Sequence, residues 1–191
     1  MQIEFEATFL KVDKEQIRAQ LNKIGAVILY SEFLMKRVVF DPPINIKGGW
    51  MRVRQEADKI TLSLKMVDGD RIENQHETEL VIDDFNKGIN FLEYIGANKK
   101  AYQETKREMW KYKNCEICID TWPGLNPFVE IEGPNENIVK EVSRELEFDY
   151  TQAFFGAVGG VYLRELQIPE DIINNHTAEI TFSNPPQKYE K

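Results

Sequence analysis

Polar and apolar side chains alternate without a break over residues 3–9, close to the N-terminus. Successive side chains of a strand point to opposite faces, so Glu4, Glu6 and Thr8 share one face and the apolar residues share the other. The pattern predicts a strand with one face on a hydrophobic core. The opposite face is either exposed to solvent or forms the wall of a charged cavity.

Period-two alternation and short β-rich runs, bounded by glycine, proline and aspartate, predict eight more strands. They cover residues 26–30, 33–41, 50–55, 59–66, 75–82, 106–112, 115–120 and 128–132.

Three helices are predicted between these strands. Asp13 is placed as the N-cap of the first helix, the second begins near Asp83 or Asp84, and the third follows Gly133-Pro134-Asn135. Gly25 and Gly96 are placed to end the first two helices. The first two strand-and-helix units therefore repeat the same spacing, and a third follows. Beyond residue 165 the pattern is weaker and favours a short helix at 169–174, a strand at 178–182 and a frayed tail at 184–191.

In nearly every predicted strand, charged residues occupy the alternate positions that form one face. Apolar residues occupy the opposite face, which can pack against the helices. A sheet with one solvated face, paired across strands for solubility, satisfies this pattern. Repeated Glu-x-Glu favours the alternative, in which the charged faces line a common lumen. The expected fold class is then α+β, an antiparallel closed β-barrel with a polar, charged interior and helices packed outside. The charged set is Glu4, Glu6, Arg52, Arg54, Lys65, Glu77, Glu79, Asp120, Glu130 and Glu132.

The composition limits the classes of function. The 191 residues carry 32 acidic and 24 basic side chains, a net charge of −8, which argues against a duplex nucleic-acid binder. No linker divides the chain, so a single domain over 1–191 is expected. No apolar run of membrane-spanning length and no leader is apparent, so we expect a cytoplasmic protein that does not bind membranes. The two cysteines, Cys115 and Cys118, fall on opposite faces of a strand and indicate packing rather than a metal or redox site.

A charged lumen of this composition suits phosphate chemistry. Arginine and lysine side chains converging from several strands would bind an oligophosphate, because arginine forks match phosphate oxygens in pairs. Converging carboxylates would hold Mg²⁺ or Mn²⁺, which prefer oxygen ligands. Both features together predict a phosphoryl- or nucleotidyl-transfer site.

The same residues resemble the CYTH or triphosphate-tunnel superfamily, which includes class IV adenylate cyclases, thiamine triphosphatases and inorganic triphosphatases. The likeness runs from about residue 3 to 145 and rests on the order of several short motifs. These are Glu4-x-Glu6, the segments 37–41, 51–54 and 61–65, Glu77-x-Glu79, Lys106-Arg107, Asp120 and the segment 124–132.

The resemblance implies a role for each group of charged residues. Arg52, Arg54, Lys65 and Arg107 would hold the triphosphate, with Lys36 or Arg37 at the mouth. The metal would be bound by the carboxylates of the first and late strands, Glu4, Glu6, Glu130 and Glu132, with Asp120 close by. Glu77 and Glu79 would orient the basic residues.

The signature of such proteins is Glu-x-Glu-x-Lys, and here Thr8 occupies the lysine position. That lysine contacts phosphate, so the substitution bears directly on hydrolysis. Three functions remain open: a metal-dependent hydrolase of inorganic, thiamine or nucleoside triphosphate, a class IV adenylate cyclase, and a non-catalytic binder of polyphosphate or nucleotide. The expected partner is a small-molecule triphosphate, and the protein is expected to be a monomer or homodimer.

Overall fold

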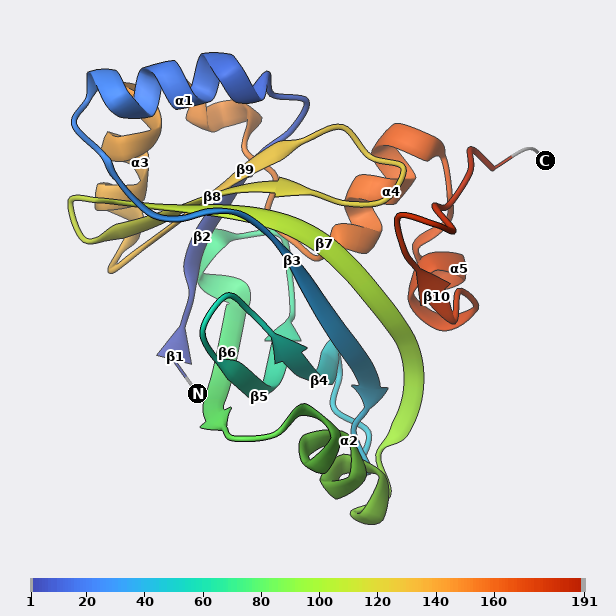
Figure 1. Cartoon of the computed structure of the whole chain (residues 1–191). Helices are drawn as coiled ribbons and strands as arrows, with labels where there is room; N and C mark the ends of the chain where they lie inside the picture. The colour runs from blue at the N-terminus through green and yellow to red at the C-terminus, as the bar shows by residue number, and fades with distance from the viewer. Residues whose placement is uncertain (1, 190–191) are drawn as a thin grey trace.

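A computed structural model describes residues 2–189 and contains one ten-stranded sheet with helices around it (Figure 1). The order of paired strands is β1-β6-β5-β4-β3-β7-β8-β9-β2, and β10 pairs with β7 outside this path. The strands are β1 (Gln2–Ile3), β2 (Phe5–Phe9), β3 (Val27–Asp41), β4 (Gly49–Gln55), β5 (Ile60–Val67), β6 (Gln75–Ile82), β7 (Asn98–Tyr112), β8 (Cys115–Thr121), β9 (Phe128–Gly133) and β10 (Glu179–Ile180).

Every pairing along the main path is antiparallel, and the sheet curls into a half-barrel, so an α+β fold with a curled antiparallel sheet is confirmed. The two ends of the path, β1 and β2, are consecutive in the chain. β1 pairs with β6, and β2 pairs with β9. The predicted first strand is therefore divided at Glu4, whose backbone N–H donates to the Gln75 carbonyl at 2.9 Å. Complete closure of the barrel stays a prediction, which this short N-terminal ladder supports.

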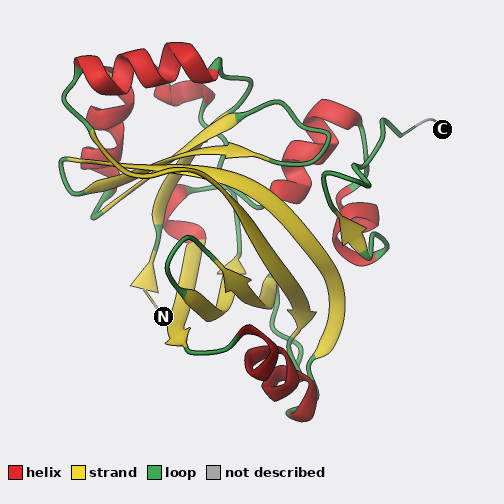
Figure 2. Cartoon of the chain, in the orientation of Figure 1, coloured by secondary structure: helices red, strands yellow, loops and turns green. Residues whose placement is uncertain are grey.

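The longest strands differ from the sequence prediction. The two strands expected at 26–30 and 33–41 form one strand, β3, and β7 begins at Asn98 rather than Lys106. Register shifts between Ile28 and Tyr30 and between Tyr30 and Phe33 bend β3 where the alternation breaks. Because β3 and β7 pair over most of their length, they form the continuous back wall of the curled sheet (Figure 2).

The three predicted helices are confirmed as α1 (Lys14–Lys23), α2 (Phe85–Tyr94) and α3 (Glu136–Glu145). Each N-cap side chain accepts a hydrogen bond from a first-turn backbone N–H: Asp13 as predicted, and also Asp84 and Asn135. α1 and α3 cover the apolar face of β2, β8 and β9, and α2 packs against β4 and β5. The apolar faces of the strands therefore point outward to the helices, and the charged faces point inward.

The C-terminal segment contains more structure than predicted. α4 (Val158–Leu166) was not predicted, whereas α5 (Glu170–Asn175) and β10 match the short helix and strand that were expected. β10 pairs with Tyr102 and Gln103 of β7, beyond the stretch of β7 that pairs with β8. The tail expected to fray is held as far as Tyr189, whose N–H donates to the Leu166 carbonyl at 3.0 Å, and its last two residues lie outside the described chain. No helix within residues 2–189 has both the length and the apolar character needed to cross a membrane.

The contact between α1 and β7 gives a stability prediction. Glu108 is 4% exposed and accepts hydrogen bonds from Arg18 at 2.7 Å and from the Trp110 indole at 2.8 Å. Burial alone would raise the pKa of Glu108, but these donors outweigh burial and hold the pKa below its ordinary value. Replacing Glu108 by Gln is expected to lower the free energy of unfolding at pH 7 by about 1–3 kcal/mol.

The pH dependence has a defined sign. A carboxylate with a depressed folded pKa stabilises the protein above its unfolded pKa, near 4.3 for Glu, and loses that effect as the pH falls. Urea unfolding should therefore separate wild type from Glu108→Gln at pH 7 and bring them together below about pH 4. Glu15→Gln is the matched control, because Glu15 also pairs with Arg18 but its side chain is 82% exposed. Equal stability of the Glu108 variant and wild type at pH 7 would refute this account.

Candidate functional site

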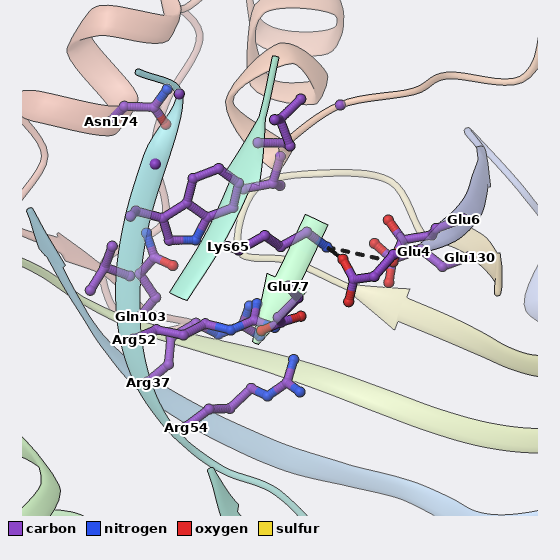
Figure 3. A pocket seen from close by; sticks show the side chains of 18 of the residues that line it. Glu4, Glu6, Arg37, Arg52, Arg54, Lys65, Glu77, Gln103, Glu130 and Asn174 are labelled. Carbon is purple, nitrogen blue, oxygen red and sulfur yellow. Dashed lines mark hydrogen bonds and ion pairs between the residues drawn. The ribbon is translucent and has the colours of Figure 1, made fainter. Parts of the chain in front are cut away.

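The curled sheet surrounds a cavity of about 1160 Å³, and about half of the residues that line it are charged (Figure 3). This volume is slightly above the roughly 300–1,000 Å³ of sites that take drug-sized ligands. Strands β2 to β9 contribute inward-facing residues, and the start of α4 together with α5 completes the wall. The inward parity predicted from sequence is therefore found on one continuous surface.

Cationic side chains come from three neighbouring strands and from β7. Arg52 and Arg54 lie two residues apart on β4, so both point into the cavity. Arg52 lies 3.1 Å from Glu77, and Arg54 lies 3.2 Å from Glu79. The structure thus brings Glu77 and Glu79 against the two arginines that sequence reasoning expected them to orient.

Carboxylates gather on the opposite side, where Figure 3 shows Glu4, Glu6 and Glu130 together. Glu6 is directly across from Glu132 in the β2–β9 ladder, and Glu130 is the next inward residue of β9. Lys65 reaches between the two sides: its Nζ lies 2.7 Å from Glu4 and 3.9 Å from Glu6.

Arg107 ties the remaining predicted residues to this group. Its guanidinium donates to Asp120 at 2.7 Å and to Glu130 at 2.6 Å. Asp120 is 1% exposed, so this pair is almost fully removed from solvent. Asp120 is therefore committed to Arg107, whereas Glu6 and Glu132 have no such bidentate partner among the described residues.

The acidic side carries more negative charge than its neighbours neutralise. Burial, followed by the carboxylates of Glu6 and Asp120, raises the pKa of Glu130 to about 8 against the opposing effect of Arg107. Burial and a hydrogen bond with Glu77 raise the pKa of Glu4 to about 8. Although burial acts the same way on Glu77, Arg52 holds the pKa of Glu77 below its usual range. Crowded carboxylates of this kind favour an added cation.

The residues present fit a hard divalent ion in their chemistry. They supply only carboxylate oxygens, and Glu4 Oε2 is buried without a well-directed hydrogen bond, although Lys65 lies near. Within residues 2–189, no three histidine, cysteine or acidic side chains are already gathered closely enough to coordinate one ion. Lys65 and Arg107 lie between the carboxylates. The carboxylates would therefore have to move closer together to coordinate one metal ion.

Comparison with curated protein sequences gives no significant match. A sequence model of the CYTH domain matches residues 39–156, more than half of the chain. The chain belongs to the CYTH domain family. The matched segment includes β4 to β9 and ends just before α4, so most of β3 and the C-terminal helices lie outside it.

Solved structures support the same fold at low sequence identity. A protein from Pyrococcus horikoshii OT3 has a TM-score of 0.65 at 21% identity, covering 78% of this chain and 93% of that one. A candidate adenylate cyclase from Vibrio parahaemolyticus has a TM-score of 0.70 at 13% identity, covering 84% and 97%. HpAC1 from Hippeastrum, an adenylyl cyclase candidate described as having a dominant triphosphatase activity, has a TM-score of 0.55 at 14% identity, covering 84% and 95%.

Thr8, at the signature lysine position of this CYTH chain, is directly across from Glu130 in the β2–β9 ladder, next to the acidic side of the cavity. It is 4% exposed, is not among the cavity-lining residues, and exchanges backbone hydrogen bonds with Phe154 at 3.1 and 2.9 Å. The segment that leads into α4 therefore packs directly over Thr8.

Five charged cavity residues were not assigned from the sequence: Glu56, Lys59, Lys100, Glu116 and Glu170. Glu56 lies 2.7 Å from Arg54, and Lys59 lies 3.0 Å from Glu79. Glu56 continues the parity of the two arginines, a signal that could have identified it. Arg37, predicted only as a candidate for the mouth, lines the cavity and is buried, whereas Lys36 points to the other face and stacks on Phe85.

Proposed function

We propose that this CYTH protein binds a triphosphate compound together with Mg²⁺ or Mn²⁺ in the cavity and hydrolyses one of its phosphoanhydride bonds. One observation carries the proposal: arginines and a lysine from four strands face a cluster of carboxylates across a single cavity. Such an arrangement matches the two halves of a metal–triphosphate complex, one anionic and one cationic.

The cationic side would hold the phosphates. An arginine carries five N–H donors, and Arg52 uses only some of them, to Ser63 at 3.2 Å and to Glu77 at 3.1 Å. The carboxylates fix the guanidinium in place and leave other donors for phosphate oxygens. Arg52, Arg54, Lys65 and Arg107 are thus assigned as phosphate ligands, and Glu77 and Glu79 as residues that orient them.

The acidic side would hold the metal through Glu4, Glu6, Glu130 and Glu132, with Asp120 positioning Arg107. The chemistry that a divalent ion held by these carboxylates would supply is positive charge against the phosphates. In the hydrolytic step, a water oxygen forms a bond to the terminal phosphorus while the bridging P–O bond breaks. Phosphate and diphosphate, or phosphate and the corresponding diphosphate ester, are released, and the proton of the water passes to a carboxylate or to solvent.

The test is a release assay for phosphate and pyrophosphate with purified protein. Inorganic triphosphate, thiamine triphosphate and ATP are each supplied with Mg²⁺ and with Mn²⁺. Metal-dependent phosphate release from at least one substrate is expected. Pyrophosphate and cyclic nucleotide from ATP would instead identify a cyclase. Binding without any product would identify a non-catalytic receptor, consistent with Thr8 at the signature position.

A further inference from the structure

Arg37 differs from the other arginines of the cavity because no carboxylate neutralises it. Arg52, Arg54 and Arg107 each form an ion pair with at least one glutamate or aspartate. Among the ion pairs of residues 2–189, none involves Arg37. The residue is nevertheless only 6% exposed and forms part of the cavity lining.

The register of the sheet places a second positive charge next to Arg37, which makes its burial less favourable. Arg37 is directly across from Arg54 on β4 and from Gln103 on β7. Like charges in opposite positions of neighbouring strands destabilise a sheet. Burial, and then the charges of Arg52, Arg54 and Arg107, lower the pKa of Arg37, which reflects the same imbalance.

The side chain is held in a defined orientation despite this imbalance. One terminal nitrogen donates to the Thr105 hydroxyl at 2.6 Å, and the guanidinium carbon lies 4.6 Å from the centre of the Trp122 ring. Trp122 in turn packs edge-on against Tyr162 of α4. Arg37 Nε is buried without a hydrogen-bond partner, so the fork retains unused donors. An unpaired buried charge that is held rigidly is poorly suited to stabilising a fold and well suited to binding an anion.

We propose that Arg37 is a direct phosphate ligand, the buried arginine of this cavity whose counter-ion is the substrate rather than the protein. The inference rests on the proposed function, since it takes the anion to be a triphosphate. It adds a residue of β3 to the phosphate-binding set and assigns Trp122 and Thr105 the role of positioning it.

The experiment compares Arg37→Met with wild type in two measurements. Calorimetric titration with inorganic triphosphate in Mg²⁺ should show affinity reduced by about 10- to 100-fold, since hydrogen bonds to charged groups contribute strongly. Thermal unfolding without ligand should show the variant at least as stable as wild type, because an uncompensated buried charge has been removed. The two effects have opposite signs, and a purely structural arginine would not produce them.

Arg164→Met is the matched control. Arg164 also stacks on an aromatic ring, with its guanidinium carbon 4.5 Å from the centre of the Phe154 ring, but it is exposed and does not line the cavity. This variant should bind triphosphate as wild type does.

Unchanged affinity in Arg37→Met, with a lower melting temperature, would overturn the inference and leave the proposed function intact. Failure of wild type to bind triphosphate would overturn the proposed function and this inference with it. If Arg37→Met does not fold, Arg37→Lys decides, because an ammonium lacks the fork needed to contact Thr105 and phosphate together. Affinity about 10-fold weaker is then expected, and wild-type affinity would contradict the proposal.

Discussion

Replacing Arg52 and Arg54 together by Met is expected to weaken binding of inorganic triphosphate by about 100-fold or more. Each arginine would contribute charged hydrogen bonds to phosphate, and about 1.5–3 kcal/mol for each residue gives a combined loss of this size. Calorimetric titration in Mg²⁺ measures the affinity. Unchanged affinity would remove β4 from the binding site.

Two controls separate lost binding from lost folding. The double change leaves Glu77 and Glu79 without their arginines, so a second variant combines Arg52→Met with Glu77→Gln and leaves no unpaired carboxylate at that position. It should keep the circular dichroism spectrum of wild type and still bind less tightly. Arg144→Ala changes an exposed arginine of α3 outside the cavity and should have no effect on affinity.

Replacing Glu6 and Glu130 together by Gln is expected to weaken Mn²⁺ binding by about 100-fold, since the charge of the ligands sets the affinity of oxygen sites for divalent ions. Glutamine keeps the size of the side chain but removes the negative charge. Direct titration with Mn²⁺, followed by electron paramagnetic resonance of the free ion, measures this without any turnover. Any triphosphate hydrolysis should fall with it.

The matched control is Glu141→Gln on α3, where Glu141 pairs with Lys113 at 2.5 Å on the outer surface. This variant should bind Mn²⁺ as wild type does. Wild-type Mn²⁺ affinity in the Glu6 and Glu130 variant would show that the acidic side of the cavity is not the metal site.

Alternation along the strands was sufficient to predict most of the cavity wall. Arg52, Arg54 and Lys65 share the inward parity with Glu77 and Glu79, and the strand ladders place all five side chains in one cavity. Parity could be read from sequence because each of these strands is short, regular and bounded by turns. The helices were equally accessible, since their N-caps and apolar stripes are local signals.

The position of Arg37 could not be predicted, because it depends on register rather than parity. Sequence shows that Arg37 alternates with Val38, but not that it pairs with Arg54 on one side and Gln103 on the other. Two register shifts of β3 also fall before this point, and a third follows it between Val39 and Phe40, so the phase of the alternation changes along the strand. Its burial and its lack of a carboxylate partner are therefore visible only in the folded chain.

α4 was missed for a different reason. Its first turn contains Gly159 and Gly160, which disfavour a helix in isolation. Val161 and Tyr162 of the same helix pack into a cluster with Trp122 and Phe128, so tertiary burial outweighs the low intrinsic propensity. Gly160 also meets a local packing need, since a Cβ there would lie 2.7 Å from the Phe154 ring.

The central claim is that the cavity binds a triphosphate together with a divalent ion. The most direct measurement is a calorimetric titration of wild-type protein with inorganic triphosphate, carried out with Mg²⁺ and again with EDTA. We expect saturable binding of one triphosphate per chain in Mg²⁺, clearly weaker in EDTA and lost in the Arg52 and Arg54 variant. No binding by wild type, or equal binding by wild type and that variant, would contradict the account.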